Sequence, residues 1–135
     1  MPADQPTLAF IYDRQATKNP LTLEVRLKAC ADYVDRQGWG YGGWFVDRGD
    51  AALALDRRPA LDHLCNTMRA AGADKHRVCL VFNWERFAYD VELRGQLTRR
   101  VLTLGGWVET CQGEKRTPDG KYIPTGHPNC TGPSR

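Results

Sequence analysis

The stretch Val78-Cys79-Leu80-Val81-Phe82 is the most strand-like part of this sequence. Its apolar residues follow one another without a polar interruption, and the run stops at Asn83. A short continuous apolar run is typical of a strand buried on both faces of a parallel sheet. The stretch Leu8-Ala9-Phe10-Ile11-Tyr12, near the start of the chain, has the same character and stops at Asp13. We therefore predict two central strands, at residues 8–12 and 78–82.

Three stretches around these strands have the spacing of amphipathic helices. Apolar side chains recur at Leu23, Leu27, Cys30 and Val34, at Leu61, Leu64, Cys65 and Met68, and at Leu93, Leu97, Val101 and Leu104. Pro59 suits a first helical turn, and a glycine follows each helix. Residues 44–46 and 107–110 predict two more strands. Because strands and helices alternate, we expect a three-layer α/β fold with a four-stranded, mainly parallel sheet flanked by helices.

A chain of 135 residues fits one domain. The periodicity stops after Cys111, and the remaining polar stretch is rich in glycine and proline. We therefore predict a domain over residues 1–112 and a polar Gly/Pro-rich tail over residues 113–135.

Composition excludes several classes of protein. Nineteen Lys and Arg against sixteen Asp and Glu give a net charge of +3, which permits an anionic partner without requiring one. No apolar run approaches the roughly 20 residues of a membrane span, and no signal-peptide pattern opens the chain. Five cysteines without a C-x-x-C pair are typical of reduced thiols. We expect a cytoplasmic protein without membrane contact, cofactor or metal site.

A glycine-rich stretch at residues 38–43 matches the G-x-G-x-x-G pattern of dinucleotide-binding proteins. That pattern binds a pyrophosphate only between a strand and the helix that follows it. Here it follows a predicted helix and precedes a predicted strand. We expect instead a glycine-rich turn in which Trp39, Tyr41 and Trp44 cover one edge of the core.

Arginines occur in three loops at one predicted rim of the sheet. Arg14 follows the first strand, Arg86 follows the third, and Arg58 precedes the helix that begins at Pro59. Parallel sheets bind ligands at the carboxyl ends of their strands. Planar guanidinium groups match phosphate oxygens and stay charged. We predict that Arg14, Arg58 and Arg86 face one phosphate-binding basin, although each arginine alone is more commonly a solvated charge.

In this order, the motifs resemble those of the catalytic domain of the serine recombinases, the family of resolvases, invertases and large serine integrases. The matching positions are Tyr12 and Arg14 of a Tyr-x-Arg-x-Ser motif, Asp47 of an acidic loop, Arg58 and Pro59 at a helix start, and Glu85, Arg86, Phe87 and Ala88 of an Asp-Arg-Leu-x-Arg motif, with Asp90 following it. The resemblance covers about residues 7–112. It implies a resolvase-catalytic-domain-like fold, with Tyr12, Asp47 and Glu85 supporting the three arginines.

Two of the departures from the family pattern bear directly on cleavage; in two others, Arg26 stands for a glutamine and Ala51-Ala52 for Ser-Gly. Ala16 occupies the position of the nucleophilic serine, and a methyl group cannot attack phosphorus. Tyr89 replaces the second arginine of the motif after the third strand. The hydroxyl of Thr17 is adjacent, but successive side chains of an extended segment point in opposite directions. No catalytic nucleophile is therefore intact at the expected position.

The leading hypothesis is a recombinase-like domain linked to site-specific recombination that has lost strand cleavage and acts through binding. Its candidate partners are DNA, a second copy of the chain and an active recombinase. One alternative is a fragment or serine-to-alanine mutant of an active recombinase, so that enzymatic activity stays open. The other is a protein-interaction module without a DNA role, whose arginines only stabilise the fold.

Overall fold

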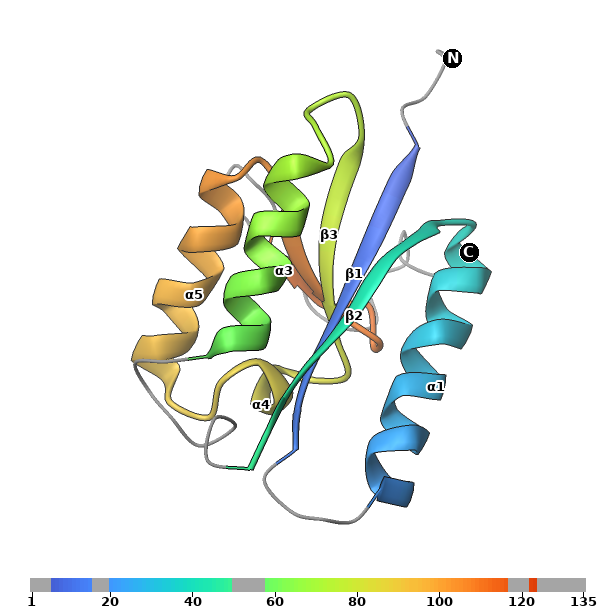
Figure 1. Ribbon diagram of the computed structural model, residues 1–135, viewed down its shortest axis with the longest axis vertical. Coiled ribbons are helices and arrows are strands. Elements are labelled where there is room, and N and C mark those ends of the chain that lie inside the picture. The colour runs from blue at the N-terminus through green and yellow to red at the C-terminus, as the bar shows by residue number, and fades with distance from the viewer. Residues whose placement is uncertain (1–5, 16–19, 50–57, 117–121, 124–135) are drawn as a thin grey trace.

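The computed structural model describes residues 6–15, 20–49, 58–116 and 122–123 (Figure 1). The elements are β1 (Thr7–Gln15), α1 (Pro20–Gln37), β2 (Gly40–Arg48), α3 (Pro59–Ala70), β3 (His76–Val81), α4 (Trp84–Phe87), α5 (Val91–Thr103), β4 (Trp107–Thr110), β5 (Lys115–Arg116) and β6 (Tyr122–Ile123). The strands form one sheet in the order β2-β1-β3-β4-β5-β6. β1 pairs in parallel with β2 and β3, and β3 with β4. The predicted α/β class is confirmed.

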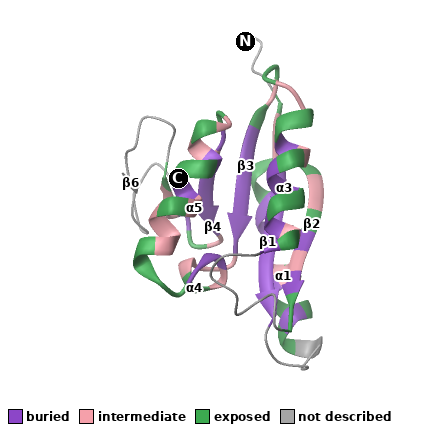
Figure 2. Cartoon of the chain, turned by 60° about the vertical axis from the view of Figure 1, so that its left-hand side comes forward, coloured by how far each residue is buried: buried purple, intermediate pink, exposed green. Residues whose placement is uncertain are grey.

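Helices cover both faces of the sheet. α3 and α5 lie on one side of it and α1 lies on the other (Figure 1). The central strand β1 contributes side chains to the apolar clusters on both faces of the sheet. Phe10 and Tyr12 pack toward α3, while Ala9 and Ile11 pack toward α1. The buried colouring of β1, β3 and β4 in Figure 2 follows from this double cover. The continuous apolar runs of the sequence are thus strands without a solvent-facing side.

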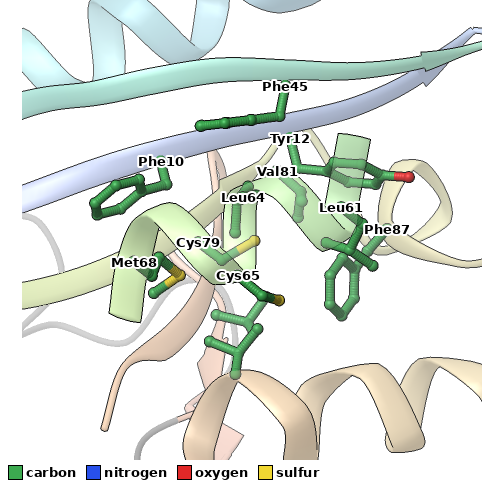
Figure 3. Packing of buried hydrophobic residues seen from close by; sticks show 12 residues of the cluster. Phe10, Tyr12, Phe45, Leu61, Leu64, Cys65, Met68, Cys79, Val81 and Phe87 are labelled. Atoms are coloured by element: carbon green, nitrogen blue, oxygen red, sulfur yellow. The ribbon is translucent and has the colours of Figure 1, made fainter. Parts of the chain in front are cut away.

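The larger apolar cluster lies between the sheet and α3 (Figure 3). The predicted stripe of α3 is fully buried there, and Val101 of α5 joins it. The ring of Phe87 packs edge-on against Tyr12 with centroids 6.3 Å apart. Burying a side chain of this size stabilises a fold by about 1.5–3 kcal/mol. Phe87 therefore anchors the short helix α4 to the end of the sheet.

The glycine-rich stretch divides between a turn at Gly38, which ends α1 with a φ of +74°, and strand β2, which begins at Gly40. A Cβ atom on Gly42 would lie 2.5 Å from the ring of Phe10, so only glycine permits this close approach. Gly43 has a φ of +137°, and the pairing of β1 with β2 shifts by one residue beside Phe10. The predicted turn is therefore present only at Gly38; from Gly40 onward the prediction was wrong, because glycine there fits backbone against a ring and does not reverse the chain.

The aromatic residues of this stretch separate into two groups. Trp39 packs edge-on against Tyr33 and Trp107, with ring centroids 5.8 and 6.3 Å away. Tyr41 and Trp44 are instead 46% and 47% exposed. The expectation that all three tryptophan and tyrosine side chains of the stretch cover the core therefore holds only for Trp39.

The sheet continues past the predicted boundary at residue 112. β5 pairs antiparallel with β4, and β6 pairs antiparallel with β5, so the sheet has six strands rather than four. Each added strand has two residues. Strands this short carry no periodicity, which is why the sequence between 113 and 135 read only as a tail. Within the described parts of the chain, no helix is long and apolar enough to cross a membrane.

Candidate functional site

Arginine side chains link the ends of β1 and β3 through backbone carbonyls. Arg14, near the end of β1, donates from Nε and Nη2 to the carbonyl oxygen of Glu85, at 3.0 and 2.7 Å. Arg86 donates in return from Nη1 to the carbonyl oxygen of Arg14, at 3.1 Å. The first turn of α4 is held from within by Asn83, whose side chain accepts from the backbone N–H of Arg86. β1 and α4 are therefore joined by hydrogen bonds in both directions, because each donates an arginine side chain to a backbone carbonyl of the other.

Arg58 approaches α4 from another direction. It precedes α3, is only 5% exposed, and donates from Nη1 to the carbonyl oxygen of Phe87 at 2.5 Å. Arg14, Arg58 and Arg86, which we call the arginine cluster, thus all donate to backbone at the carboxyl ends of β1 and β3. The structure brings together the three arginines that the sequence placed on separate loops.

The charges of Arg58 and Arg86 both act on the guanidinium group of Arg14. Burial lowers the pKa of Arg14 most, and the charges of Arg58 and Arg86 lower it further. Like charges gathered in a partly buried place disfavour the charged form. A bound anion would relieve this repulsion, and arginine matches phosphate and carboxylate oxygens with paired donors. The arrangement is therefore suited to an oxyanion.

Asp47 supports the arginine cluster from the end of β2. Its carboxylate accepts from the backbone N–H groups of Ala60 and Leu61, at 2.8 and 3.3 Å, and so caps the N-terminus of α3. Arg58, at the cap position itself, makes no side-chain cap. A carboxylate at this end of a helix also interacts favourably with the helix dipole. Asp47 was predicted in a loop, but it lies in a strand and is 2% exposed.

Tyr12 completes this support. Its hydroxyl donates to Oδ2 of Asp47 at 2.7 Å. Burial raises the pKa of Tyr12, and the hydrogen bond to the Asp47 carboxylate raises it further. The phenol therefore stays protonated and holds Asp47 in place. Tyr12 and Asp47 were both expected beside the arginines, and they position Arg58 by fixing the start of α3.

Glu85 and Tyr89 contact Arg14 in different ways. Glu85 contributes its backbone carbonyl, while its exposed carboxylate forms no ion pair with another described residue. Tyr89 is 66% exposed, and the guanidinium of Arg14 lies over its ring, 5.5 Å from the centroid. A cation over an aromatic face is attracted to it. An aromatic ring thus covers Arg14 where the family motif has a second arginine.

A buried ion pair behind this site was not predicted. Arg26 of α1 donates from Nε and Nη2 to the carboxylate of Asp13, at 2.8 and 2.9 Å, and also to the side chain of Gln15 at 2.5 Å. Asp13 and Gln15 continue the α1-facing side of β1 that begins with Ala9 and Ile11. Arg26 follows Leu23 by three positions and precedes Cys30 by four, so helical spacing alone places it on the buried stripe.

Ala16 and Thr17, together with residues 50–57, lie outside the described residues. The position predicted for the nucleophile therefore directly follows the last described residue of β1, Gln15. His127 and Cys130 also lie outside. Among the residues that are described, no three histidine, cysteine, aspartate or glutamate side chains gather into a group able to hold a metal ion.

The topology and the order of the motifs agree with a family-level match. A sequence model of the family described as "Resolvase, N terminal domain" matches residues 9–123. The chain belongs to this family. It is a resolvase-like serine recombinase domain, and the family is linked to site-specific recombination. None of the curated proteins matches its sequence.

Solved structures share the fold of this resolvase-like domain. The N-terminal catalytic domain of TP901-1 integrase is similar with a TM-score of 0.62 and 20% identity, over 77% of this chain and 76% of that chain. The C-terminal catalytic domain of ISC1926 TnpA, an IS607-like serine recombinase, gives 0.63 and 18%, over 76% and 68%. A resolvase family site-specific recombinase from Streptococcus pneumoniae gives 0.65 and 15%, over 86% and 75%. At these identities the likeness concerns the fold alone.

Proposed function

We propose that this resolvase-like domain binds the phosphodiester backbone of DNA at the arginine cluster and does not cut it. The observation that carries the proposal is the gathering of three arginines at the carboxyl ends of β1 and β3, where the charges of Arg58 and Arg86 lower the pKa of Arg14. Such clustering costs free energy unless an anion is bound. In an α/β sheet this end is also where ligands bind.

The absence of cleavage is proposed from the sequence. Ala16 stands two positions after Arg14, where the family motif has its nucleophilic serine, and its methyl group offers no electron pair to a phosphorus atom. Tyr89 replaces a fixed cation that would stabilise charge on the transferred phosphoryl group. A domain with these two replacements keeps part of a phosphate site and lacks the chemistry. It would act with an active recombinase or with a second copy of itself.

Binding of a short labelled duplex at several salt concentrations tests the proposal. Phosphate contacts give log K a negative slope against log salt, and each neutralised phosphate contributes about −0.9 to it. Arg86→Gln is the best variant, because Arg86 is the least buried arginine of the cluster and Gln retains a donor amide. We expect it to reduce the slope by about 0.9.

The matched control is Arg69→Gln, which removes the same charge from the exposed side of α3, where Arg69 bonds Asn66 at 3.0 Å. Its slope should equal that of the parent protein. Equal slopes for the Arg86 and Arg69 variants would exclude the cluster as the phosphate contact.

One observation favours a second candidate, a protein-interaction module without a DNA role. Each arginine of the cluster donates to a backbone carbonyl, as an arginine with a purely structural role would. If this reading holds, Arg86→Gln lowers the free energy of unfolding, and the parent protein shows no salt-dependent affinity for the duplex. Urea denaturation beside the binding series separates the two functions.

A further inference from the structure

Two thiols from distant parts of the chain touch on the α1 side of the sheet. The Sγ atoms of Cys30, in α1, and Cys111, directly after β4, are 3.2 Å apart. Both belong to the smaller apolar cluster, which has Ile11 and Leu80 at its centre. The backbone N–H of Cys111 donates to the carbonyl oxygen of Val81 at 3.1 Å, so this residue is fixed to the end of β3. Both cysteines are held by ordered elements.

We propose that Cys30 and Cys111 form a redox modification site, at which a low-molecular-weight disulfide converts the two thiols into an intramolecular disulfide. A disulfide has a sulfur–sulfur distance of about 2.0 Å, so the sulfurs need to approach by about 1 Å. A shift of that size is within reach of side-chain rotation. This site is separate from the arginine cluster and does not depend on the proposed DNA binding.

The reaction proceeds in two exchanges. The thiolate of Cys111 attacks one sulfur of the small disulfide RSSR, which forms a protein–SR mixed disulfide and releases RS⁻. The sulfur of Cys30 then attacks the Cys111 sulfur, expels the second RS⁻ and gives up its proton. The two RS⁻ groups take the two thiol protons and leave as 2 RSH. The protein is oxidised by two electrons and RSSR is reduced by two.

The order of the exchanges follows from burial. Cys111 is half-buried, whereas Cys30 is 1% exposed. The contact with Cys111 and burial both raise the pKa of the Cys30 thiol. The more accessible sulfur of Cys111 therefore meets the reagent, and Cys30 resolves the mixed disulfide from inside.

The other described thiols are poor competitors. Cys65 and Cys79 are both 0% exposed and lie in the apolar cluster on the opposite face of the sheet (Figure 3). Burial raises the pKa of Cys79 well above its ordinary value. A reagent in solution does not reach either sulfur in the folded protein. Among the four described cysteines, Cys111 alone combines partial exposure with a thiol in contact, and this gives the site its selectivity.

Oxidation would lock α1 onto the sheet. The cross-link spans 81 positions of the chain, and closing so long a loop removes much of the freedom of the unfolded state. The same helix carries Arg26, whose guanidinium holds Asp13 at the end of β1. The oxidised protein should therefore melt roughly 5–10 °C higher than the reduced protein.

The test uses the full chain, reduced and then equilibrated with mixtures of oxidised and reduced glutathione. After alkylation of the remaining thiols, trypsin digestion without reductant should give residues 29–36 linked to residues 101–115, as cleavage follows Lys28, Arg36, Arg100 and Lys115. Reduction should separate the two peptides. The parent protein alone decides the result, so the outcome does not depend on the folding of a variant.

Two variants sharpen the test of the proposed disulfide. Cys30→Ser should leave Cys111 as a stable mixed disulfide with glutathione, because the resolving sulfur is gone. Cys130→Ser, which changes a cysteine outside the pair, should give the same linked peptides as the parent. The proposal is overturned if glutathione accumulates on Cys111 of the parent, if Cys111 links to Cys130 instead, or if both thiols stay alkylatable at every mixture.

Discussion

Arginines bind backbone carbonyls at both ends of the sheet, but in different surroundings. At the amino end of β3, Arg77 donates from Nη1 to the carbonyl of Met68 at 3.0 Å and from Nη2 to that of Leu104 at 2.7 Å. One guanidinium thus joins the C-terminal ends of α3 and α5. At the carboxyl end, the arginine cluster places three guanidinium groups around one short helix.

The difference lies in the charge around each arginine. Arg77 meets the negative ends of two helix dipoles, which is a favourable place for a cation. In the cluster, the charges of Arg58 and Arg86 instead oppose that of Arg14 and contribute to its lowered pKa. The same contact can therefore serve stability alone at one end of a sheet and, in the function proposed above, prepare a place for an anion at the other.

The largest effect is expected on DNA cleavage. Ala16→Ser alone should give no covalent adduct, because one cation of the site is still missing. Ala16→Ser with Tyr89→Arg should react about 100- to 1000-fold faster, the usual effect of one preorganised donor. Denaturing gels of a supercoiled plasmid with the site of an active family member would measure it. The active family member is added as a partner in a form that lacks its own nucleophilic serine. Any covalent protein–DNA adduct then belongs to this chain. Adducts from Ala16→Ser alone would contradict the prediction.

Arg77→Met should lower the free energy of unfolding by about 3 kcal/mol. The change keeps most of the side-chain volume but leaves two helix-terminal carbonyls without their charged donor, and such bonds contribute about 1.5–3 kcal/mol each. Urea denaturation measures the loss. The salt dependence of duplex binding should not change, in contrast to Arg86→Gln. A stable Arg77 variant would show that the amino-end contacts do not support the fold.

Asp47→Ala should cost about 2 kcal/mol of unfolding free energy, at the upper end for loss of a helix cap. The variant removes an acceptor for two backbone N–H groups of α3 and for the hydroxyl of Tyr12. Asp62→Ala is the matched control, since Asp62 lies on the exposed side of α3 and pairs with Arg100 at the surface. In thermal melts, Asp47→Ala should unfold at a clearly lower temperature than Asp62→Ala. Equal melting temperatures would mean that water replaces the Asp47 carboxylate without loss of stability.

The smallest effect is expected at Tyr89. Replacing it by Leu removes the ring under Arg14 and should lower the free energy of unfolding by about 0.5 kcal/mol, as for other exposed cation–ring pairs. Tyr89→Phe keeps the ring and should be neutral. Chemical denaturation of the two variants side by side would detect the difference. A loss shared equally by Leu and Phe would assign the effect to the hydroxyl instead.

Much of the fold was accessible from the sequence because its strands are buried on both faces. The apolar runs at residues 8–12 and 78–82 fall within β1 and β3, and the stripe on α3 is buried as predicted. β5 and β6 were missed because two residues carry no period. The strand predicted at residues 44–46 was shorter than β2, because glycines usually mark turns, whereas Gly42 is required by the ring of Phe10.

The site was accessible only in part. Arginine at a strand end is a recognisable signal, so Arg14 and Arg86 could be placed at one rim. Nothing in their spacing shows that their donors bind backbone carbonyls, because those partners lie some 70 positions away in the chain. Arg26 was missed although it lies on a buried helical stripe. A charged residue at such a position predicts a buried partner, and Asp13 is that partner.

The kinked backbone of β2 also has a consequence for self-association. β2 is the edge of the six-stranded sheet, and it carries the exposed rings of Tyr41 and Trp44. An open strand edge with exposed aromatic side chains is a template onto which a second strand can add, and so a starting point for aggregation. The positive φ of Gly43 and the irregular register beside it divide this edge into two short pieces. The break that seats a phenylalanine ring thereby also blunts the edge against amyloid-like pairing.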